Sequence, residues 1–265
     1  KTLSKGDRFN IVRFGTDFQD LFAESLEYNE HTLGKAVAYV REIKADLGGT
    51  EIYPALKHIF NMPQLKSHRR ELMVLTDGEV GNVNEVISLA QDHRNDTRIF
   101  SFGIGYGSSE SLVRGLARVT HGAAEFISPD EQIEAKVLAQ FSRVATPAMN
   151  NVRIDWQGMR IKQSPVEIPP IFSGDSFTVY GLVESGKPNG DVTLTATIGE
   201  REVSWSAPVQ SEDDGNLIPT LWARSYIRWL ESDPLLDGGS SQTVRKREVR
   251  KKGLVEIGLR YNLMS

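Results

Sequence analysis

Short apolar runs alternate with stretches of helical periodicity over residues 1–145. Strands that are apolar at nearly every position are typical of parallel sheets covered on both faces. We expect such strands at residues 9–14, 72–76, 99–103 and 124–127, with 72–76 buried on both faces. Their alternation with helical segments predicts the α/β class, with a doubly wound, mainly parallel sheet.

The segments between these strands have the three- and four-residue spacing of helices. Residues 32–47 carry one apolar stripe, and Gly48 and Gly49 should end that helix. The stripe consists of Leu33, Val37, Val40, Ile43 and Leu47. A second helix should begin near Pro54, where a missing N–H costs little, and others are expected at residues 83–93, 109–120 and 130–144.

Apolar and polar residues alternate in steps of two after Asn150, which predicts antiparallel strands. Five segments follow this pattern: residues 152–156, 160–163, 177–183, 192–198 and 202–206. Five strands are enough for one sheet and part of a second.

Helical spacing returns at residues 217–230. Beyond the breakers Asp233-Pro234 and Gly238-Gly239, it continues at 243–263. We therefore expect three parts. They are an α/β domain at residues 1–146, an antiparallel β domain at 150–208 and a helical C-terminal segment at 216–265.

Composition narrows the classes of function. The 265 residues include no cysteine, which excludes disulfide-stapled scaffolds, thiolate metal sites and cysteine nucleophiles. The net charge of -4, from 31 basic and 35 acidic residues, argues against broad nucleic-acid binding. No apolar run approaches the roughly 18 residues of a membrane span, so we expect no membrane contact within this chain. The chain begins at Lys1 rather than at a methionine, and we interpret it as a fragment.

One run, residues 245–252, is strongly basic and contains a single acid, Glu248. We interpret this run as a solvated helix face or loop. Contact with anionic lipid or nucleic acid is the alternative, which salt-dependent binding to heparin or DNA would reveal.

Ligands of an open parallel sheet bind at the carboxyl ends of its strands. Three loops at such positions are candidate sites: residues 47–51, 76–79 and 103–107. Asp77 directly follows an apolar strand and precedes a glycine, a suitable position for a ligand of a hard cation. Thr50 either caps the helix that follows it or reaches a metal. The glycines of 103–107 lack the spacing of a dinucleotide-binding loop, so we interpret that run as a strand-to-helix turn.

Five segments together resemble the von Willebrand factor type A domain. They are Gly6-Asp7-Arg8-Phe9, NIVRFGT (10–16), DLGGTEIYPAL (46–56), LTDGEVGN (75–82) and FSFGIGYG (100–107). The resemblance covers residues 1–144 and is closest to the version found beside inter-alpha-trypsin-inhibitor-type domains. The strands after Asn150 look most like bacterial members, some of which resemble cell-surface proteins handled by sortases.

The resemblance implies a metal-ion-dependent adhesion site that holds a divalent cation, usually magnesium, with manganese or calcium as alternatives. Thr50 matches the threonine of the family's second metal loop, and Asp77 matches the aspartate of its third. The first loop of the family, Asp-x-Ser-x-Ser, occurs nowhere in this sequence. The first strand and helix of the domain are therefore expected upstream of Lys1, and another segment should pair with the edge they leave open.

The implied function is a non-enzymatic, adhesion-type module of a surface or secreted protein. Its partner would be a protein that offers a carboxylate to the bound cation. A metal-dependent hydrolase is the first alternative, with Glu51 and Glu79 as the nearby acids, although no nucleophile or oxyanion arrangement accompanies Asp77. A structural surface protein with a vestigial metal site is the second.

Overall fold

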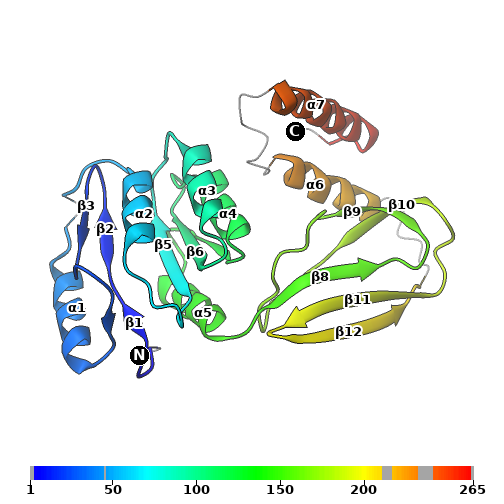
Figure 1. The fold of residues 1–265 in the computed structure, drawn as a ribbon. Coiled ribbons are helices and arrows are strands. Elements are labelled where there is room, and N and C mark those ends of the chain that lie inside the picture. The colour runs from blue at the N-terminus through cyan, green and yellow to red at the C-terminus, as the bar shows by residue number, and fades with distance from the viewer. Residues whose placement is uncertain (1–2, 45, 211–216, 232–240, 264–265) are drawn as a thin grey trace. The chain divides into compact units, whose positions relative to one another are not determined.

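The computed structural model describes residues 3–44, 46–210, 217–231 and 241–263 (Figure 1). The expected breakers at 233–234 and 238–239 lie outside these residues. The chain divides into two compact units, Lys1–Phe141 and Ser142–Ser265. The expected antiparallel part and the expected helical C-terminal segment fall in the same second unit.

The first unit contains a parallel sheet in the order β5-β6-β7. The strands are β5 (Arg70–Thr76), β6 (Thr97–Ile104) and β7 (Ala124–Ile127). The register pairs Leu72 with Ile99 and Ser101 with Ala124. This confirms the parallel α/β arrangement.

Three helices cover one face of this sheet: α2 (Ile52–Asn61), α3 (Val83–Asp92) and α4 (Glu110–Val119). Their buried side chains form one core with the sheet, which includes Leu56, Val86, Ile99 and Leu116. Both α3 and α4 lie where the apolar periodicity predicted them. The helix α5 (Ile133–Ala145), which continues past the boundary between the units, begins three residues later than expected. The Glu131 carboxylate accepts a hydrogen bond from the Ser128 amide and forms a turn first.

Four short strands precede the parallel sheet and pair as two hairpin-like sheets. β1 (Arg8–Phe9) pairs with β4 (Leu26–Glu27), and β2 (Val12–Phe14) pairs with β3 (Phe18–Asp20), both antiparallel. The single strand expected at 9–14 is therefore divided in two. Asn10 divides it, because its side chain takes the backbone hydrogen bonds of Phe22, accepting from N at 3.0 Å and donating to O at 2.7 Å.

The helix α1 (Glu30–Glu42) begins at a capping box in which Asn29 and Thr32 bond each other's backbone amides. It ends five residues before the expected end, so Gly48 and Gly49 do not stop it. The chain leaves the helix at Ile43 because Leu47 is tied to the loop after β2, where its carbonyl oxygen accepts from Thr16 N at 2.6 Å.

The burial of two apolar segments in this unit differs from what their patterns suggest, and the stated expectation for residues 72–76 is wrong. The α1 stripe is not a core face, since Val37, Val40 and Ile43 are 43%, 51% and 42% exposed, while Ala36 is buried. The strand β5 is not covered on both faces, since Leu75 is 46% exposed. Among the described residues β5 pairs only with β6, so no neighbouring strand there covers its other edge.

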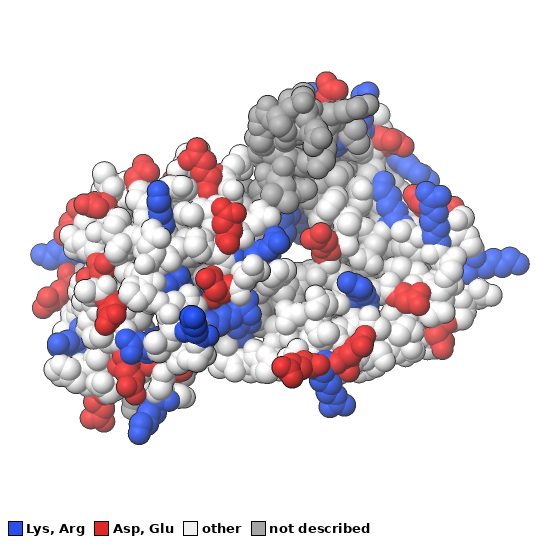
Figure 2. Space-filling view, in the orientation of Figure 1, with Lys and Arg blue, Asp and Glu red and all other residues white. Residues whose placement is uncertain are grey.

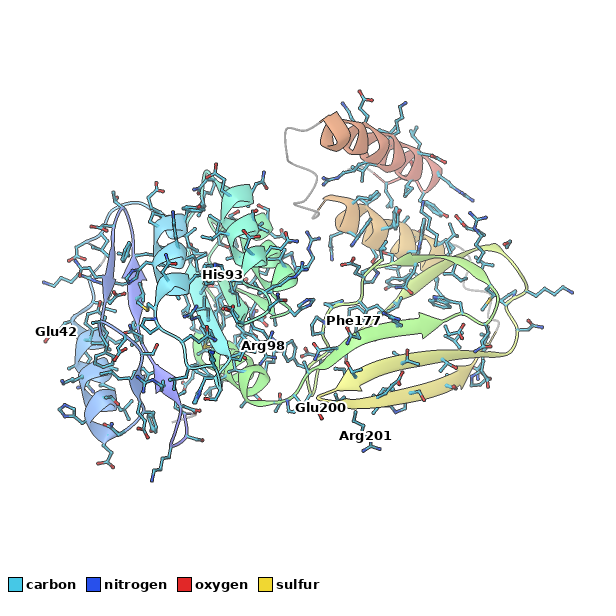
Figure 3. All side chains as sticks on the ribbon, viewed as in Figure 1. Glu42, His93, Arg98, Phe177, Glu200 and Arg201 are labelled. Carbon is cyan, nitrogen blue, oxygen red and sulfur yellow. The ribbon has the colours of Figure 1, made fainter. Side chains whose placement is uncertain are left out.

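The second unit contains two antiparallel sheets, as the period of two predicted. One has the order β12-β11-β8 and the other pairs β10 with β9. Their bounds are β8 (Met149–Asp155), β9 (Arg160–Ser164), β10 (Tyr180–Ser185), β11 (Asp191–Ile198) and β12 (Arg201–Pro208). Glu200 and Arg201 mark the tight connection from β11 to β12 (Figure 3).

The helix α6 (Leu217–Glu231) packs against the smaller sheet and against a second helix, α7 (Ser241–Arg260). Their shared core holds Trp222, Ala223, Ile227 and Ile257. The Trp222 indole N–H donates to the backbone oxygen of Lys162 at 2.8 Å, which fastens α6 to β9.

Candidate functional site

The loops that follow β5 and β6 lie against each other at the carboxyl edge of the parallel sheet. A Cβ placed on Gly107 would lie 3.1 Å from the backbone oxygen of Asp77. Because any larger residue would press on this oxygen, Gly107 allows the two loops to approach. Two of the three loops chosen from the sequence are thus neighbours in space.

The third candidate loop, which precedes α2, lies on the Asp77-Gly78 turn. A Cβ placed on Gly78 would lie 2.5 Å from Thr50 Oγ1, too close for any real side chain. Gly78 N also donates to Thr76 Oγ1 at 3.4 Å. The structure therefore places the Thr50 hydroxyl directly beside the turn that carries Asp77.

Both candidate ligands have oxygens that the fold leaves unused. Thr50 is half-buried and Asp77 is exposed. Within the described part of the chain, neither the Thr50 hydroxyl nor the Asp77 carboxylate makes a hydrogen bond or an ion pair. Their oxygens are available to a ligand.

Thr50 does not cap α2. The N-cap residue of this helix is Glu51, which makes no side-chain cap hydrogen bond. The interpretation of Thr50 as a helix cap is therefore wrong, because the chain enters the helix one residue later. Glu51 and Glu79 are both exposed.

A fourth loop, Gly15-Thr16, was not among the loops expected from the sequence, and it holds the Thr50 loop in place. Thr16 Oγ1 accepts from Gly49 N at 3.0 Å, and Glu51 N donates to the Gly15 carbonyl at 2.8 Å. A Cβ on Gly15 would lie 2.5 Å from the backbone oxygen of Leu47. The signal was present, because a Gly-Thr pair after an expected strand is another strand-end loop.

The donor chemistry fits part of a hard-cation site. Hydroxyl and carboxylate oxygens are the ligands that Mg²⁺ and Ca²⁺ prefer, and magnesium requires close to six of them. No group of three or more His, Asp or Glu side chains suited to a metal occurs among the residues that the structure describes. Thr50 and Asp77 therefore supply only a part of such a coordination shell.

Comparison with known proteins identifies the first unit. Residues 1–126 match the family model of the von Willebrand factor type A domain. A solved structure, the von Willebrand factor type A protein from Catenulispora acidiphila, superposes with a TM-score of 0.51 at 14% identity, over 98% of this chain and 72% of that chain. At this identity the likeness concerns the fold alone. Residues 1–126 therefore belong to the von Willebrand factor type A domain family.

Relatives from distant eukaryotes carry the same domain name. A von Willebrand factor A domain-containing protein of Dictyostelium discoideum is 33% identical over 270 residues, covering 100% of this chain and 13% of that protein. The von Willebrand factor A domain-containing protein 5A of Rattus norvegicus is 32% identical over 276 residues, covering 100% of this chain and 32% of that protein.

The chain spans about a third or less of the length of these relatives. Proteins with this domain are typically protein-interaction modules. In the described residues, no helix is both long and apolar enough to cross a membrane. Acidic and basic side chains are interspersed over the face shown in Figure 2.

Proposed function

We propose that the first unit is a non-enzymatic, divalent-cation-dependent protein-binding module of a larger surface or secreted protein. Thr50 and Asp77 hold a magnesium, manganese or calcium ion, and a carboxylate of the protein partner fills a further coordination position. The observation that carries this proposal is that both side chains have unused oxygens, and that the Thr50 hydroxyl lies beside Gly78, the residue that follows Asp77 at the carboxyl edge of the sheet.

The remaining ligands come, in this proposal, from an Asp-x-Ser-x-Ser loop upstream of Lys1. The strand before that loop would pair with β5 and β2, which have one unpaired edge each among the described residues. The exposed Leu75 on β5 supports such a neighbour. The helix α2 also supports a strand between β2 and β5, because it contacts β2 and shares a core with β5 (Figure 1).

The setting of the module is part of the same proposal. Pairing with an inter-alpha-trypsin-inhibitor-type domain rests on the resemblance of residues 1–144. An extracellular or cell-surface location, in a bacterial protein handled by sortases, rests on the resemblance of the strands after Asn150. The second unit would then be the region that follows the A domain in such proteins.

Calorimetric titration of magnesium and manganese into the protein that includes the upstream loop tests the proposal. Asp77→Ala should abolish cation binding and cation-dependent partner binding, with the far-UV circular dichroism unchanged. Asp92→Ala is the matched control, because Asp92 is an exposed aspartate at the end of α3. Unchanged metal affinity in Asp77→Ala would reject the assignment. Wild-type protein without cation affinity would favour the vestigial site.

The hydrolase alternative is tested at Glu79. In the binding module, Glu79→Gln should change partner affinity by no more than about twofold, because an exposed loop carboxylate contributes little. Turnover of ester, phosphate or peptide substrates with manganese that disappears in Glu79→Gln would replace the binding module by the enzyme.

A further inference from the structure

A cavity of about 590 Å³ lies in the second unit between the β9–β10 sheet and the two helices. Its walls come from β9, β10, α6 and α7, and include Lys162, Glu184, Trp222 and Arg260. Its volume falls within the range of ligand pockets in proteins, about 300–1,000 Å³. The cavity is independent of the candidate metal site, which lies in the first unit.

Lys162 carries a positive charge that no described carboxylate balances. Its ammonium nitrogen lies 4.5 Å from the centre of the Tyr226 ring and 5.7 Å from that of Trp222. No acidic side chain of the described residues lies within 4.0 Å of this nitrogen. Burial and the charge of Glu184 raise the pKa of Tyr226, so the phenol stays neutral and is no counter-ion. A half-buried cation of this kind favours an anionic ligand.

The other charges around the cavity leave this preference in place. Glu184 is engaged by Arg160, whose Nε lies 3.0 Å from its Oε2. Arg260 lies over the Tyr261 ring at 5.6 Å and, among the described residues, has no carboxylate within 4.0 Å. The one remaining acid of the wall is Glu256. Two unbalanced cations therefore face one free carboxylate.

The helix α7 leaves room for a ligand at Gly253. This glycine lines the cavity, and a Cβ added to it would meet no atom within 4 Å. A glycine inside a helix lowers stability by about 1 kcal/mol relative to alanine. Because the space beside Gly253 is open, a larger side chain there would fill the cavity without straining the backbone.

We propose that this cavity binds an acidic segment of a polypeptide partner, with a Glu or Asp carboxylate paired to Lys162 and Arg260. Tryptophan, tyrosine and arginine are the residues that dominate binding energy at protein interfaces, and all three line this cavity. The space exceeds what one carboxylate fills, since it would hold roughly 20 water molecules at about 30 Å³ each. It therefore takes a stretch of peptide rather than a lone anion.

The test uses the full chain and a fluorescein-labelled peptide of alternating Glu and Gly, with fluorescence anisotropy at about 0.15 M salt. EDTA is present, so that the result does not depend on the metal site of the proposed function. Lys162→Met should weaken binding at least tenfold, because it removes the charge and keeps an apolar stem beside Tyr226. Lys187→Met, in the exposed turn before β11, is the charge-matched control and should stay within about twofold.

A second variant, Gly253→Leu, should abolish binding by filling the cavity while the helix signal in circular dichroism is retained. The proposal is overturned if the peptide fails to bind, if a Gln-Gly peptide binds equally well, or if the Lys162 and Lys187 variants lose the same affinity. Competition by free glutarate at the same carboxylate concentration would indicate a small-anion site instead. A single-stranded oligonucleotide that binds in a Lys162-dependent way would indicate a nucleic-acid site.

Discussion

Among the glycines that the structure describes, Gly122 has the least room for a side chain. It follows α4 and packs its α-carbon against β6, where a Cβ would lie 1.9 Å from the carbonyl oxygen of Ile99 and 2.6 Å from its carbon. Ile99 cannot easily retreat. Its side chain is fully buried, its amide donates to Thr120 Oγ1 at 2.9 Å, and it is paired with Leu72 of β5.

The Gly122→Ala substitution therefore requires a movement of the backbone. Ordinary van der Waals contact begins near 3.4 Å, so the oxygen and the new methyl must separate by about 1.5 Å, the difference between 3.4 and 1.9 Å. Overpacking that a side chain can relieve costs about 1–3 kcal/mol. Because here the obstacle is backbone, we expect the free energy of unfolding to fall by at least about 3 kcal/mol.

Two other glycines make a graded control series with the same substitution. Gly115→Ala would meet the Ile87 side chain, whose Cδ1 lies 2.3 Å from the added Cβ and can rotate away, so we expect a loss of about 1–2 kcal/mol. Gly34 lies in α1 and its added Cβ meets nothing within 4 Å. Gly34→Ala should therefore stabilise the protein by about 0.5–1 kcal/mol.

Urea unfolding followed by far-UV circular dichroism measures the series. At about 1–3 kcal/mol per molar urea, Gly122→Ala should lower the midpoint of the first unit by about 1 M or more. Tryptophan fluorescence separates the units, because the four tryptophans, Trp156, Trp205, Trp222 and Trp229, all lie in the second unit. If the free energy of unfolding of Gly122→Ala lies within about 0.5 kcal/mol of the wild-type value, the prediction from the close backbone contact is refuted.

Two further predictions concern ion pairs. Arg98 on β6 (Figure 3) makes a bidentate ion pair with Glu71, at 2.9 Å from Nη2 to Oε1, and the two side chains are only 12% and 21% exposed. Arg98→Ala should lower the free energy of unfolding by about 2–3 kcal/mol in thermal or urea unfolding, because it leaves Glu71 without its counter-ion. A change below about 0.5 kcal/mol would contradict this. Hydrogen bonds from Lys136 and from the Ser128 amide lower the pKa of Glu131. The Glu131 carboxylate therefore stabilises the fold at pH values above its ordinary pKa, and this stabilisation is lost as the pH falls through the lowered pKa. In an NMR titration, Lys136→Gln should raise the pKa of Glu131 towards its ordinary value, and an unchanged titration would contradict the assigned cause.

Periodicity in the sequence predicted the elements of this fold better than their ends. The strand β7 and the helix α3 lie where the apolar pattern placed them. The ends were missed where a side chain bonds to backbone, as Asn10 does to Phe22 and Glu131 does to the Ser128 amide. Such bonds depend on a partner that the local pattern does not identify.

The candidate site could be predicted in part because parallel topology sends strand ends to one edge of the sheet. That rule brought the loops of Asp77 and Gly107 together, and the close contact at Gly107 agrees with it. The Thr50 loop joins α1 to α2 and follows no strand, so the family resemblance rather than this rule pointed to it. Thr16 was missed because it acts through the backbone, by accepting a hydrogen bond from Gly49. Its role requires a contact over a long sequence separation, which neither composition nor spacing reveals.

Burial was the property that the pattern predicted least well, and the reason is physical. A period of 3.6 residues shows which side chains of α1 share a face, but the neighbouring element decides which face is covered. In α1 the covered positions are Thr32 and Ala36, one turn apart, while Val37 and Val40 remain exposed. Leu75 on β5 shows the same dependence, because its exposure reflects what lies beside the strand rather than the apolar run that forms it. Loop positions at strand ends are fixed by connectivity, so they follow from the order of elements, whereas burial follows only from the complete set of neighbours.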